Sequence, residues 1–413
     1  MPTVIVCPAS VVENAWISDA KNFPQLKVVN GRANGRSKRK ALIDGEYDII
    51  VYNFESFRLH VADFAKRGIR RLIIDESSYL KNPDSQQTKA CIALADFCDE
   101  VYLLSGTPAP NGEHEYYGQL RCIDRNEAGV NFYRWVQRWM YPLKMNVRGR
   151  DVIRGWRMRE DKRRDFEAML QRRAWVLRKE DCLSLPDKVF VDRWLDLGDS
   201  ERKAYDSMLM TLRAEFDGKA IDASAAGRTM KLRQICGGWL YDEGREPVVV
   251  GQSKLDALDE VRDEIGGRPM IVWGIFQSDL DRLQSHFGDA ARIVDGRTNI
   301  GHRPAIFAGF GRDYPILLAH PQACGHGVTL TQASYAVYYS LGFSLEQYLQ
   351  SIDRIHRIGQ ASKCTYFRLL ARGTIDEQIV KVLDRKLTAV DALRAVLAGG
   401  ATDELVDQVM SRF

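Results

Sequence analysis

Short apolar runs alternate with helix-length amphipathic segments in two regions of the chain. The first region has runs at residues 3–8, 48–53, 71–75 and 101–105. The second has runs at residues 270–276, 292–295, 315–320, 335–341 and 365–370. Such alternation is typical of a parallel sheet with helices on both faces. The sequence therefore predicts an α/β fold with two lobes.

The region between the two sets is rich in helix formers and contains tryptophans at 135, 139, 156, 175, 194 and 239. It predicts helical insertions rather than a third sheet. After Gly373, a Thr cap with Glu377 three residues later starts a helical pattern that reaches about Leu397. The expected domains are a partial first lobe (1–111), helical insertions with the lobe linker (112–250), a second lobe (251–372) and a C-terminal helical brace (373–413).

Composition limits the class of protein. Of the 413 residues, 45% are hydrophobic and 28% charged, and no stretch approaches the ~20 apolar residues of a membrane span. The first residues lack the pattern of a signal peptide. The eight cysteines form no Cys-x-x-Cys pair, so neither zinc nor a disulfide framework is expected. We expect a cytoplasmic protein without a membrane partner, and its preference for Arg over Lys favours a bacterial or phage source.

Basic residues are concentrated in one segment. Residues 144–164 carry nine basic and three acidic side chains, although the net charge of the whole chain is only +4. Arg148, Arg150 and Arg154 are therefore candidates for contacts to a DNA backbone. A solvated charged loop is the alternative.

An acidic pair ends one of the predicted strands. Asp75 and Glu76 follow the run Arg-Leu-Ile-Ile, and parallel sheets bind ligands at the carboxyl ends of their strands. Asp75 is a candidate to hold Mg²⁺ through water, and Glu76 to orient an attacking water. The alternative is an ordinary acidic helix start.

The next strand ends in small polar residues. Ser105, Gly106 and Thr107 precede Pro108, and their hydroxyls are candidates to sense the state of a nucleotide. Taken alone, this sequence is only a turn.

Two arginines stand near the end of a predicted helix. With helical spacing, Gln350, Arg354 and Arg357 share one face, while Ile352, Ile355 and Ile358 pack behind them. A guanidinium bonds two phosphate oxygens at once, which suits a transferring γ-phosphate. The alternative is a solvated face.

The order of these motifs resembles the Swi/Snf-type branch of superfamily-two helicases. Asp-Glu-Ser-Ser with Lys81-Asn82 comes first, then Ser-Gly-Thr-Pro, then Gln-x-x-Asp-Arg-x-x-Arg-x-Gly-Gln. Further matches include Val6–Ser10 with Trp16, residues 47–55, 177–188, 232–236 and 253–255, and in the second lobe residues 271–276, 295–298 and 324–331. The resemblance spans almost the whole chain.

The resemblance implies a DNA-dependent ATPase with two RecA-like lobes that uses ATP and Mg²⁺ and moves along double-stranded DNA. It implies that Asp75 and Glu76 are the Walker B pair, and that Arg354 and Arg357 are arginine fingers. The remaining implied sites fall into two groups. For nucleotide binding or coupling they are Ser105, Gly106, Thr107, Gly325, Gly327, Gln350, Asp353 and Gln360. For DNA they are Ser10, Asn53, Lys81, Asn82 and Thr331.

The sequence departs from the family pattern at two points. No Gly-x-Gly-Lys-Thr loop precedes residue 6, although such a loop normally cradles the phosphates. A truncated record, a split gene whose second polypeptide supplies the loop, or a loss of hydrolysis would each explain this, and the retained acidic and arginine residues favour the first two. In addition, Ser77-Ser78 replaces the usual Ala-His pair, which puts the coupling of hydrolysis to lobe movement in doubt.

Two other functions remain open at this point. One is a DNA-binding or assembly subunit that keeps the helicase shape without catalysis. The other is a strand-separating helicase, for which a wedge would have to lie within the insertion between residues 135 and 156.

Overall fold

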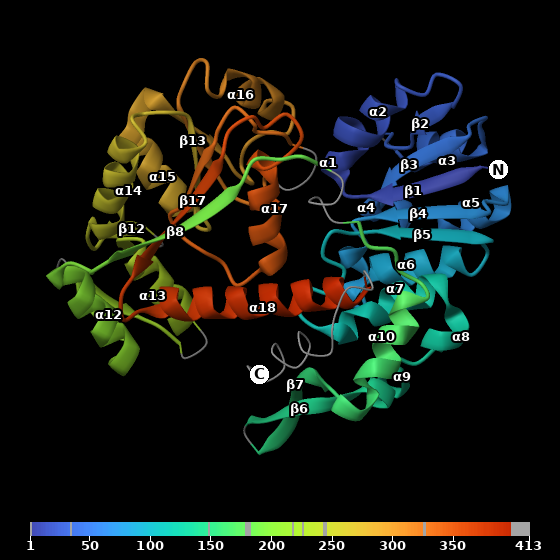
Figure 1. Ribbon diagram of the computed structural model, residues 1–413, viewed down its shortest axis with the longest axis horizontal. Coiled ribbons are helices and arrows are strands. Elements are labelled where there is room, and N and C mark those ends of the chain that lie inside the picture. The colour runs from blue at the N-terminus through green and yellow to red at the C-terminus, as the bar shows by residue number, and fades with distance from the viewer. Residues whose placement is uncertain are drawn as a thin grey trace. The chain divides into compact units, whose positions relative to one another are not determined.

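The computed structural model describes residues 2–33, 35–147, 149–177, 183–216, 219–224, 227–242, 246–324 and 328–397. The chain forms two compact units (Figure 1). Unit 1 comprises Met1–Leu177 and Thr388–Phe413, and unit 2 comprises Arg178–Leu387. Among the helices that the structure describes, none has both the length and the apolar character to cross a bilayer.

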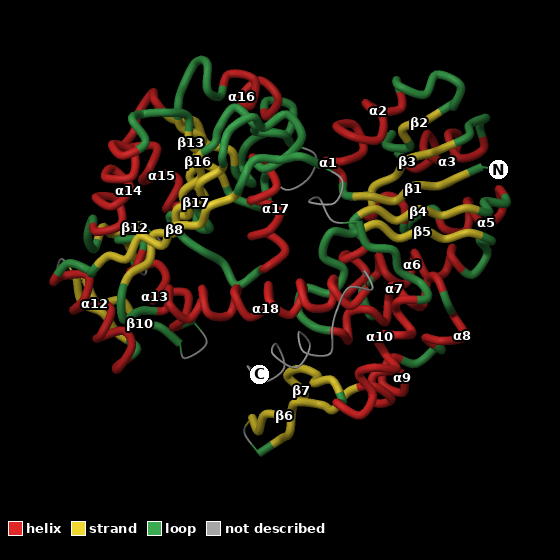
Figure 2. The backbone as a smooth tube through the Cα atoms, in the orientation of Figure 1, coloured by secondary structure: helices red, strands yellow, loops and turns green. Residues whose placement is uncertain are grey.

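Unit 1 is built on a parallel five-stranded sheet in the order β2-β3-β1-β4-β5. The strands are β1 (Thr3–Cys7), β2 (Val28–Asn30), β3 (Ile49–Asn53), β4 (Arg71–Asp75) and β5 (Glu100–Leu104). The elements between them are α1 (Ala9–Val11), the π-helix η1 (Val12–Ile17), α2 (Ser18–Ala20), α3 (Arg36–Asp44), α4 (Phe54–Phe57), α5 (Val61–Arg67), the 3₁₀ helix η2 (Ser77–Lys81) and α6 (Gln86–Ala95). Figure 2 shows the strands side by side with helices around them.

Both faces of this sheet are covered at its central strand β1, whereas Tyr102 and Leu104 of the edge strand β5 are exposed. Along β1, Val4 and Val6 belong to one apolar cluster, whereas Ile5 and Cys7 belong to another. All four side chains are fully buried. Because successive strand residues point to opposite faces, this alternation requires an apolar layer on each side. The continuous apolar run that predicted a parallel strand is the direct result.

The rest of unit 1 combines helices with a β-hairpin. Its elements are η3 (Glu113–Glu115), α7 (Tyr116–Ile123), α8 (Arg125–Ala128), α9 (Phe132–Trp139), β6 (Met140–Val147), β7 (Arg150–Met158), η4 (Glu160–Lys162) and α10 (Arg163–Gln171). Their core is aromatic, with Trp135, Trp139 and Phe166 each almost fully buried. Phe166 meets both indole rings edge-on, at centroid distances of 6.1 and 5.4 Å.

Unit 2 is built on a parallel six-stranded sheet in the order β14-β15-β13-β16-β17-β8. The strands are β8 (Lys188–Leu195), β13 (Met270–Trp273), β14 (Ala291–Val294), β15 (Ile316–Ala319), β16 (Tyr335–Tyr338) and β17 (Cys364–Ala371). The helices are α12 (Asp199–Thr211), α13 (Arg228–Cys236), α14 (Ser253–Glu264), α15 (Gln277–Phe287), η5 (Gly288–Ala290), α16 (Arg303–Gly309), α17 (Leu345–Ile355) and α18 (Ile375–Leu397). Two small antiparallel pairs join β9 (Arg213–Phe216) to β10 (Lys219–Asp222) and β11 (Trp239–Tyr241) to β12 (Pro247–Val249).

The two-lobed α/β fold is confirmed, and each predicted apolar run contains a strand. The expectation for residues 112–250 differs from the structure. This region contains the hairpin β6–β7 and the small pairs β9–β10 and β11–β12, and β8 is an edge strand of the second sheet. The short strand β2 was also missed. The division between units falls after Leu177, inside the range 112–250 predicted to hold the insertions and the lobe linker, and α18 contributes its last turns to unit 1.

The missed strands are either only three or four residues long, as β2, β9, β10, β11 and β12 are, or interrupted by charged residues, as β6, β7 and β8 are. β6 and β7 are interrupted by charged residues, and β8 carries the charged residues Lys188, Asp192 and Arg193. Their pairing depends on partners: β8 lies beside β17 through a parallel register from Lys188 to Leu195. Local periodicity cannot show such a long-range pairing.

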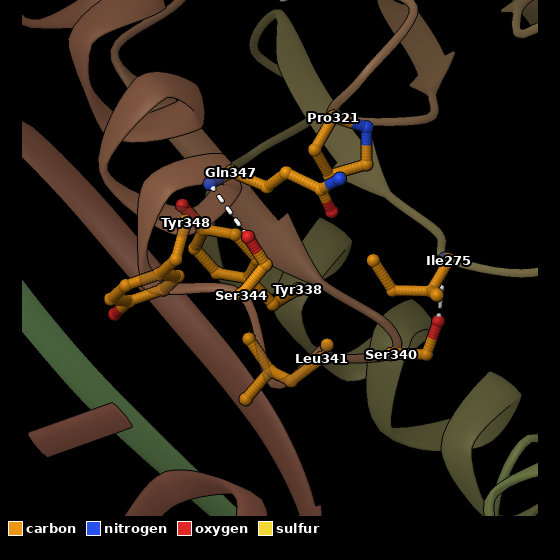
Figure 3. Close-up of a pocket in the computed structure, with 9 residues that line it drawn as sticks. Ile275, Pro321, Tyr338, Ser340, Leu341, Ser344, Gln347 and Tyr348 are labelled. Carbon is orange, nitrogen blue, oxygen red and sulfur yellow. Dashed lines mark hydrogen bonds between the residues drawn. The ribbon is translucent and has the colours of Figure 1, made fainter. Parts of the chain in front are cut away.

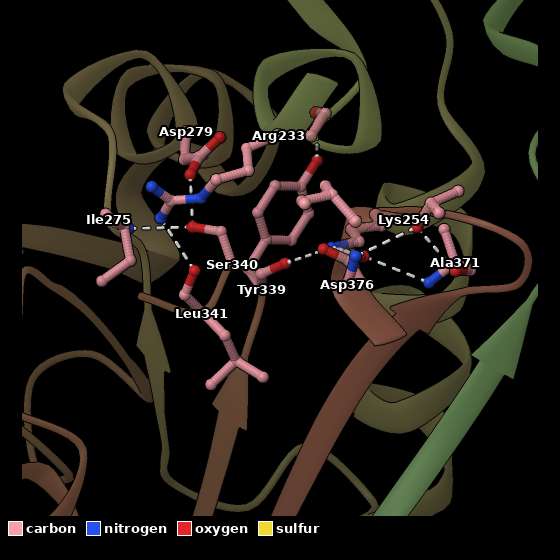
Figure 4. Close-up of polar contacts among 12 residues, drawn as sticks. Arg233, Lys254, Ile275, Asp279, Tyr339, Ser340, Leu341, Ala371 and Asp376 are labelled. Carbon is pink, nitrogen blue, oxygen red and sulfur yellow. Dashed lines mark hydrogen bonds and ion pairs between the residues drawn. The ribbon is translucent and has the colours of Figure 1, made fainter. Parts of the chain in front are cut away.

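A buried ion pair holds the start of α14 against the start of α18 in unit 2 (Figure 4). Lys254 Nζ lies 2.7 Å from Asp376 Oδ2, and the two residues are 2% and 4% exposed. Lys254 also donates to the Tyr339 carbonyl at 3.1 Å, and Asp376 accepts from the Ala371 N–H at 3.1 Å. Each charge therefore has a partner besides its counterion, which a buried pair requires.

We expect Lys254→Met to lower the free energy of unfolding by about 3–5 kcal/mol, because it leaves the Asp376 carboxylate buried without its counterion. The double variant Lys254→Met/Asp376→Leu should lose less than the single variant. Urea denaturation measures both. The exposed pair Lys27–Glu46, 3.8 Å apart, provides the control, since Lys27→Met should cost under about 1 kcal/mol. Equal losses at Lys254 and Lys27 would contradict the proposed role of burial.

Candidate functional site

Asp75 and Glu76 lie at the carboxyl end of β4, between β1 and β5 in the sheet. One carboxylate oxygen of Asp75 accepts the indole N–H of Trp16 at 2.9 Å. The other accepts the backbone N–H of Glu76 at 2.9 Å. Two directed donors therefore fix the orientation of the Asp75 carboxylate. Trp16 stands in the π-helix η1, a helix type that is frequent at functional sites.

Glu76 has a left-handed backbone, with φ 55° and ψ 56°. In the described part of the chain, only Leu212 shares a positive φ among the non-glycine residues. This conformation costs an L-residue about 1–2 kcal/mol, and glycine or asparagine would adopt it more readily. A glutamate held in this conformation is a backbone outlier of the kind that occurs at active sites.

Cys7 ends β1, the strand beside β4. Burial, reinforced by the charge of Asp75, raises the pKa of the Cys7 thiol to about 12. The thiol therefore stays protonated at neutral pH and is not a nucleophile. At this edge of the sheet, the carboxylates of Asp75 and Glu76 are therefore the candidate reactive groups.

The loop that begins with Glu76 and Ser77, here called the acidic loop, is linked to the loop after β5 through Gln119 of α7. The Ser77 hydroxyl donates to Gln119 Oε1 at 2.9 Å, and Gln119 Nε2 donates to the Pro108 carbonyl at 2.6 Å. The helix comes close because Gly118 faces the loop: a Cβ there would lie 2.2 Å from the Leu80 carbonyl oxygen. Ser77 and Gln119 are both almost fully buried. Sequence reasoning missed Gln119, and only the neighbouring Gly118 gave a signal.

The predicted polar turn after β5 is partly accessible. Ser105 is half-buried and accepts the Thr107 N–H at 3.2 Å, whereas Thr107 is 7% exposed. Gly106 is exposed, and its carbonyl accepts a hydrogen bond from Arg394. The loop after β5 is linked to Ser77, the residue after the acidic pair, through Pro108 and Gln119.

The residues predicted to contact DNA in unit 1 differ in accessibility. Ser10 and Lys81 are half-buried, and Asn82 is exposed with its side-chain oxygen accepting from the Asp84 N–H at 3.0 Å. Asn53 is 7% exposed and donates to Glu55 at 2.6 Å. Asn53 is therefore not placed as a surface residue that contacts DNA, because it is buried and its amide nitrogen donates to Glu55.

In unit 2, α17 ends at Ile355 and does not extend through Arg357. Arg354 is 7% exposed, with its guanidinium donating to the carbonyls of Gln350 at 3.0 Å and Val328 at 3.2 Å. Arg357 lies beyond the helix and is exposed. The prediction that Gln350, Arg354 and Arg357 share one helical face is therefore wrong for Arg357.

Two features of the segment after α17 are incompatible with a longer helix. The His356 ring donates from Nε2 to the Pro186 carbonyl at 2.8 Å, and Gly359 turns the chain with φ 98°. Ile352 and Ile355 pack inside as expected, but Ile358 is 67% exposed. A helix through residue 358 would have buried all three.

Gln360 joins the segment after α17 to the loop before β16. Its amide nitrogen donates to the Ala333 carbonyl at 2.9 Å and lies 3.5 Å from the Thr331 carbonyl. The Leu330 N–H donates in turn to the Arg354 carbonyl at 2.9 Å. Gln350, Asp353 and Thr331 are half-buried in the same region. Gly325, Gly327 and Arg148 lie outside the described residues, whereas Arg150 and Arg154 are exposed on β7.

The start of α17 is fixed beside β16, next to a small pocket (Figure 3). The Ser344 hydroxyl accepts the Gln347 N–H at 3.3 Å, which caps the helix. The Ser340 hydroxyl accepts the Ile275 N–H at 2.8 Å. Tyr338 and Tyr348 line the pocket between these anchors, with ring centroids 5.0 Å apart. Hydrogen bonds therefore hold both the start and the end of α17.

The Asp75 carboxylate is the group in unit 1 that fits an outer-shell magnesium ligand. Each of its oxygens accepts one protein hydrogen bond and keeps a further lone pair. That donor set suits the water shell of Mg²⁺, which sheds its waters reluctantly.

Comparisons with known proteins agree with this arrangement. A family model described as SNF2-related domain matches residues 1–238, and one described as helicase conserved C-terminal domain matches residues 253–359. Three similar proteins illustrate the range. A putative protein p41 of Acyrthosiphon pisum secondary endosymbiont phage 1 is 25% identical over 95% of this chain and 87% of its own length. An uncharacterized ATP-dependent helicase of Mycoplasma genitalium is 24% identical over 94% of this chain, which covers 36% of that protein. A mouse SWI/SNF-related, matrix-associated, actin-dependent regulator of chromatin (subfamily A member 1) is 26% identical over 94% of this chain, which covers 38% of that protein.

We expect Glu76→Asn to raise the free energy of unfolding by about 1 kcal/mol, because asparagine tolerates the left-handed backbone better than glutamate. Urea denaturation measures the change. Glu46, whose side chain is 94% exposed and whose φ is not positive, provides the control: Glu46→Asn should leave stability within about 0.5 kcal/mol. A loss of stability at Glu76 would contradict the prediction that relief of the left-handed backbone outweighs the side-chain interactions of Glu76.

Proposed function

Because the chain belongs to the SNF2-related family, we propose that it is an ATP-dependent motor that moves along double-stranded DNA. The observation that carries this proposal is the acidic pair at the end of β4, with Asp75 held by two donors and Glu76 in a left-handed backbone. The two units are RecA-like lobes. Directed carboxylates at a strand end suit phosphoryl transfer, in which positioning supplies most of the catalysis.

In the proposed reaction, Glu76 orients the attacking water, and Asp75 would hold Mg²⁺ through the water shell of the ion. When bound, Mg²⁺ supplies positive charge that neutralises the phosphate oxygens. Trp16 keeps the Asp75 carboxylate in place. The Ser77–Gln119–Pro108 link joins the acidic loop to the loop that carries Ser105 and Thr107. This link is the route by which we propose that the nucleotide state reaches the rest of unit 1.

The two arginines of unit 2 have different proposed roles. Arg357 is exposed beyond α17, and we assign it the contact with the transferring phosphate. Arg354 is buried against the carbonyls of Val328 and Gln350, so it acts as a positioning residue for the loop that follows Gly325 and Gly327. Its Nε and Nη1 donate to these two carbonyls and only 7% of the residue is exposed, which supports a positioning role. His356 holds the segment between the two arginines.

The proposed DNA track uses Ser10, Lys81, Asn82 and Thr331, with Arg150 and Arg154 as additional phosphate contacts. Such contacts fix the position of the protein without reading sequence. The 413-residue sequence contains no Gly-x-Gly-Lys-Thr loop. The proposal therefore requires that another polypeptide segment supplies the phosphate loop.

The test is ATP hydrolysis by this chain combined with a first-lobe segment of a family member that carries the phosphate loop. We expect double-stranded DNA to stimulate phosphate release. Glu76→Gln and Arg357→Lys should each lower the stimulated rate at least ~100-fold, since an arginine finger contributes 10³–10⁵ in related phosphoryl transfer.

Arg372→Lys serves as the matched control in unit 2, because Arg372 is a half-exposed surface arginine that pairs with Asp196. It should leave the rate within a factor of about two. Hydrolysis that DNA never stimulates would reject the motor. DNA binding that survives without any hydrolysis would favour a non-catalytic DNA-binding subunit.

A further inference from the structure

The β6–β7 hairpin extends from an aromatic base beyond the helices of its own unit (Figure 1). At the base, Met140 pairs with Met158, and these residues are 2% and 4% exposed. Trp156 packs on Phe132 with ring centroids 5.9 Å apart. The base is therefore part of the core of unit 1, and it holds the distal part of the hairpin as a fixed projection.

One face of the distal hairpin is apolar and exposed. The antiparallel register places Met145 opposite Val152 and Leu143 opposite Gly155, and residues directly opposite each other share a face. Leu143 and Met145 are each 49% exposed, and Val152 is 43% exposed. A two-stranded hairpin gains little from apolar side chains that stay half exposed to water. This face is therefore suited to a partner.

Basic side chains surround that face. Between Met140 and Met158 the sequence has five basic residues and one acidic residue. In the described part of the chain, Lys144, Arg150, Arg154 and Arg157 are exposed and take part in no ion pair. The register shifts between Leu143 and Lys144, so Arg154 is an extra, bulged residue. A bulge re-aims the side chain that it carries.

These features favour nucleic acid over a protein partner. Unpaired arginines on an exposed ribbon match a row of phosphates. A face of Leu, Met and Val flanked by arginines matches the side chains that proteins insert between base steps in the minor groove. A protein interface core, by contrast, is depleted in charge.

We propose that the β6–β7 hairpin is a duplex-DNA wedge. Arg150 and Arg154 bind phosphates, while Leu143, Met145 and Val152 enter the minor groove and partly unstack one base step. This inference rests on the DNA binding of the proposed function, but it does not require hydrolysis or a phosphate loop. It adds deformation of the duplex to the phosphate contacts already proposed.

The first test measures binding of the 413-residue chain to a fluorescein-labelled 30-base-pair duplex by anisotropy over a range of salt concentrations, without nucleotide. Arg150→Gln/Arg154→Gln should reduce the slope of log K against log salt by about 2, since each phosphate contact contributes about 0.9. The exposed Lys66, on α5 of the same unit, gives the matched control. Lys66→Gln should leave both affinity and slope unchanged.

The second test places 2-aminopurine in the same duplex, because its fluorescence rises when the base is unstacked. The unaltered protein should raise the signal, and Leu143→Ser/Met145→Ser should abolish the rise while the salt slope stays the same. Leu59, 48% exposed elsewhere in unit 1, supplies the control Leu59→Ser, which should keep the rise. Circular dichroism confirms that each variant is folded.

Three results of the DNA experiments would each overturn the wedge, and so would one result on the oligomeric state. The first is that the unaltered protein binds DNA without raising the 2-aminopurine fluorescence. The second is that Leu143→Ser/Met145→Ser keeps the full rise in fluorescence. The third is that Arg150→Gln/Arg154→Gln keeps the full salt slope. If Leu143→Ser/Met145→Ser instead converts a dimer to a monomer in sedimentation and leaves DNA binding unaffected, the occupant is a second copy of the chain and the wedge is rejected. A protein that binds no DNA at all would reject the proposed motor as well, which distinguishes the two failures.

Discussion

The parallel pairing of β4 between β1 and β5 is the constraint on which the site of unit 1 depends. Because parallel strands bring their carboxyl ends to one edge, Cys7, Asp75 and the turn after Leu104 lie at the same edge of the sheet. The register of β4 is set on its buried face, where Leu72 and Ile74 are fully buried, since a slip by one residue would turn these side chains away from the core. The placement of the carboxylates is thus a consequence of core packing.

Unit 2 holds its loops in another way, through cations that donate to backbone carbonyls (Figure 4). Arg233 donates to the Leu341 carbonyl at 2.8 Å and Arg282 to the carbonyls of Gly237 and Gly238 at 2.9 Å. Lys254 and Arg354 bind carbonyls in the same manner. Near this network, burial raises the pKa of Asp279, while hydrogen bonds from Ser340 and Trp239 act against the rise. Loops without regular structure gain fixed geometry because their carbonyls are satisfied by charged donors.

The sequence predicted the parts of the fold that depend on local pattern. The central strands appeared as continuous apolar runs, and the acidic pair and the polar turn appeared as abrupt ends of such runs. It did not predict β8 or the hairpin, whose strands are defined by their partners rather than by composition. The left-handed backbone of Glu76 and the link through Gln119 were also out of reach, because both arise from tertiary packing. For Arg357, the prediction from helical spacing was wrong because α17 ends before this residue. The His356 ring binds the Pro186 carbonyl, far away in the sequence, and Gly359 has a positive φ.

The hydrogen bond between the Trp16 indole and Asp75 has an optical consequence. The carboxylate charge lies at the polar end of the ring that absorbs and emits light, 2.9 Å from the indole nitrogen. An indole responds to the electric field along its long axis, so a cation or phosphate that approaches Asp75 shifts the emission of this tryptophan. Trp16, one of eight tryptophans in the chain, is thus the indole whose emission responds to charge at Asp75.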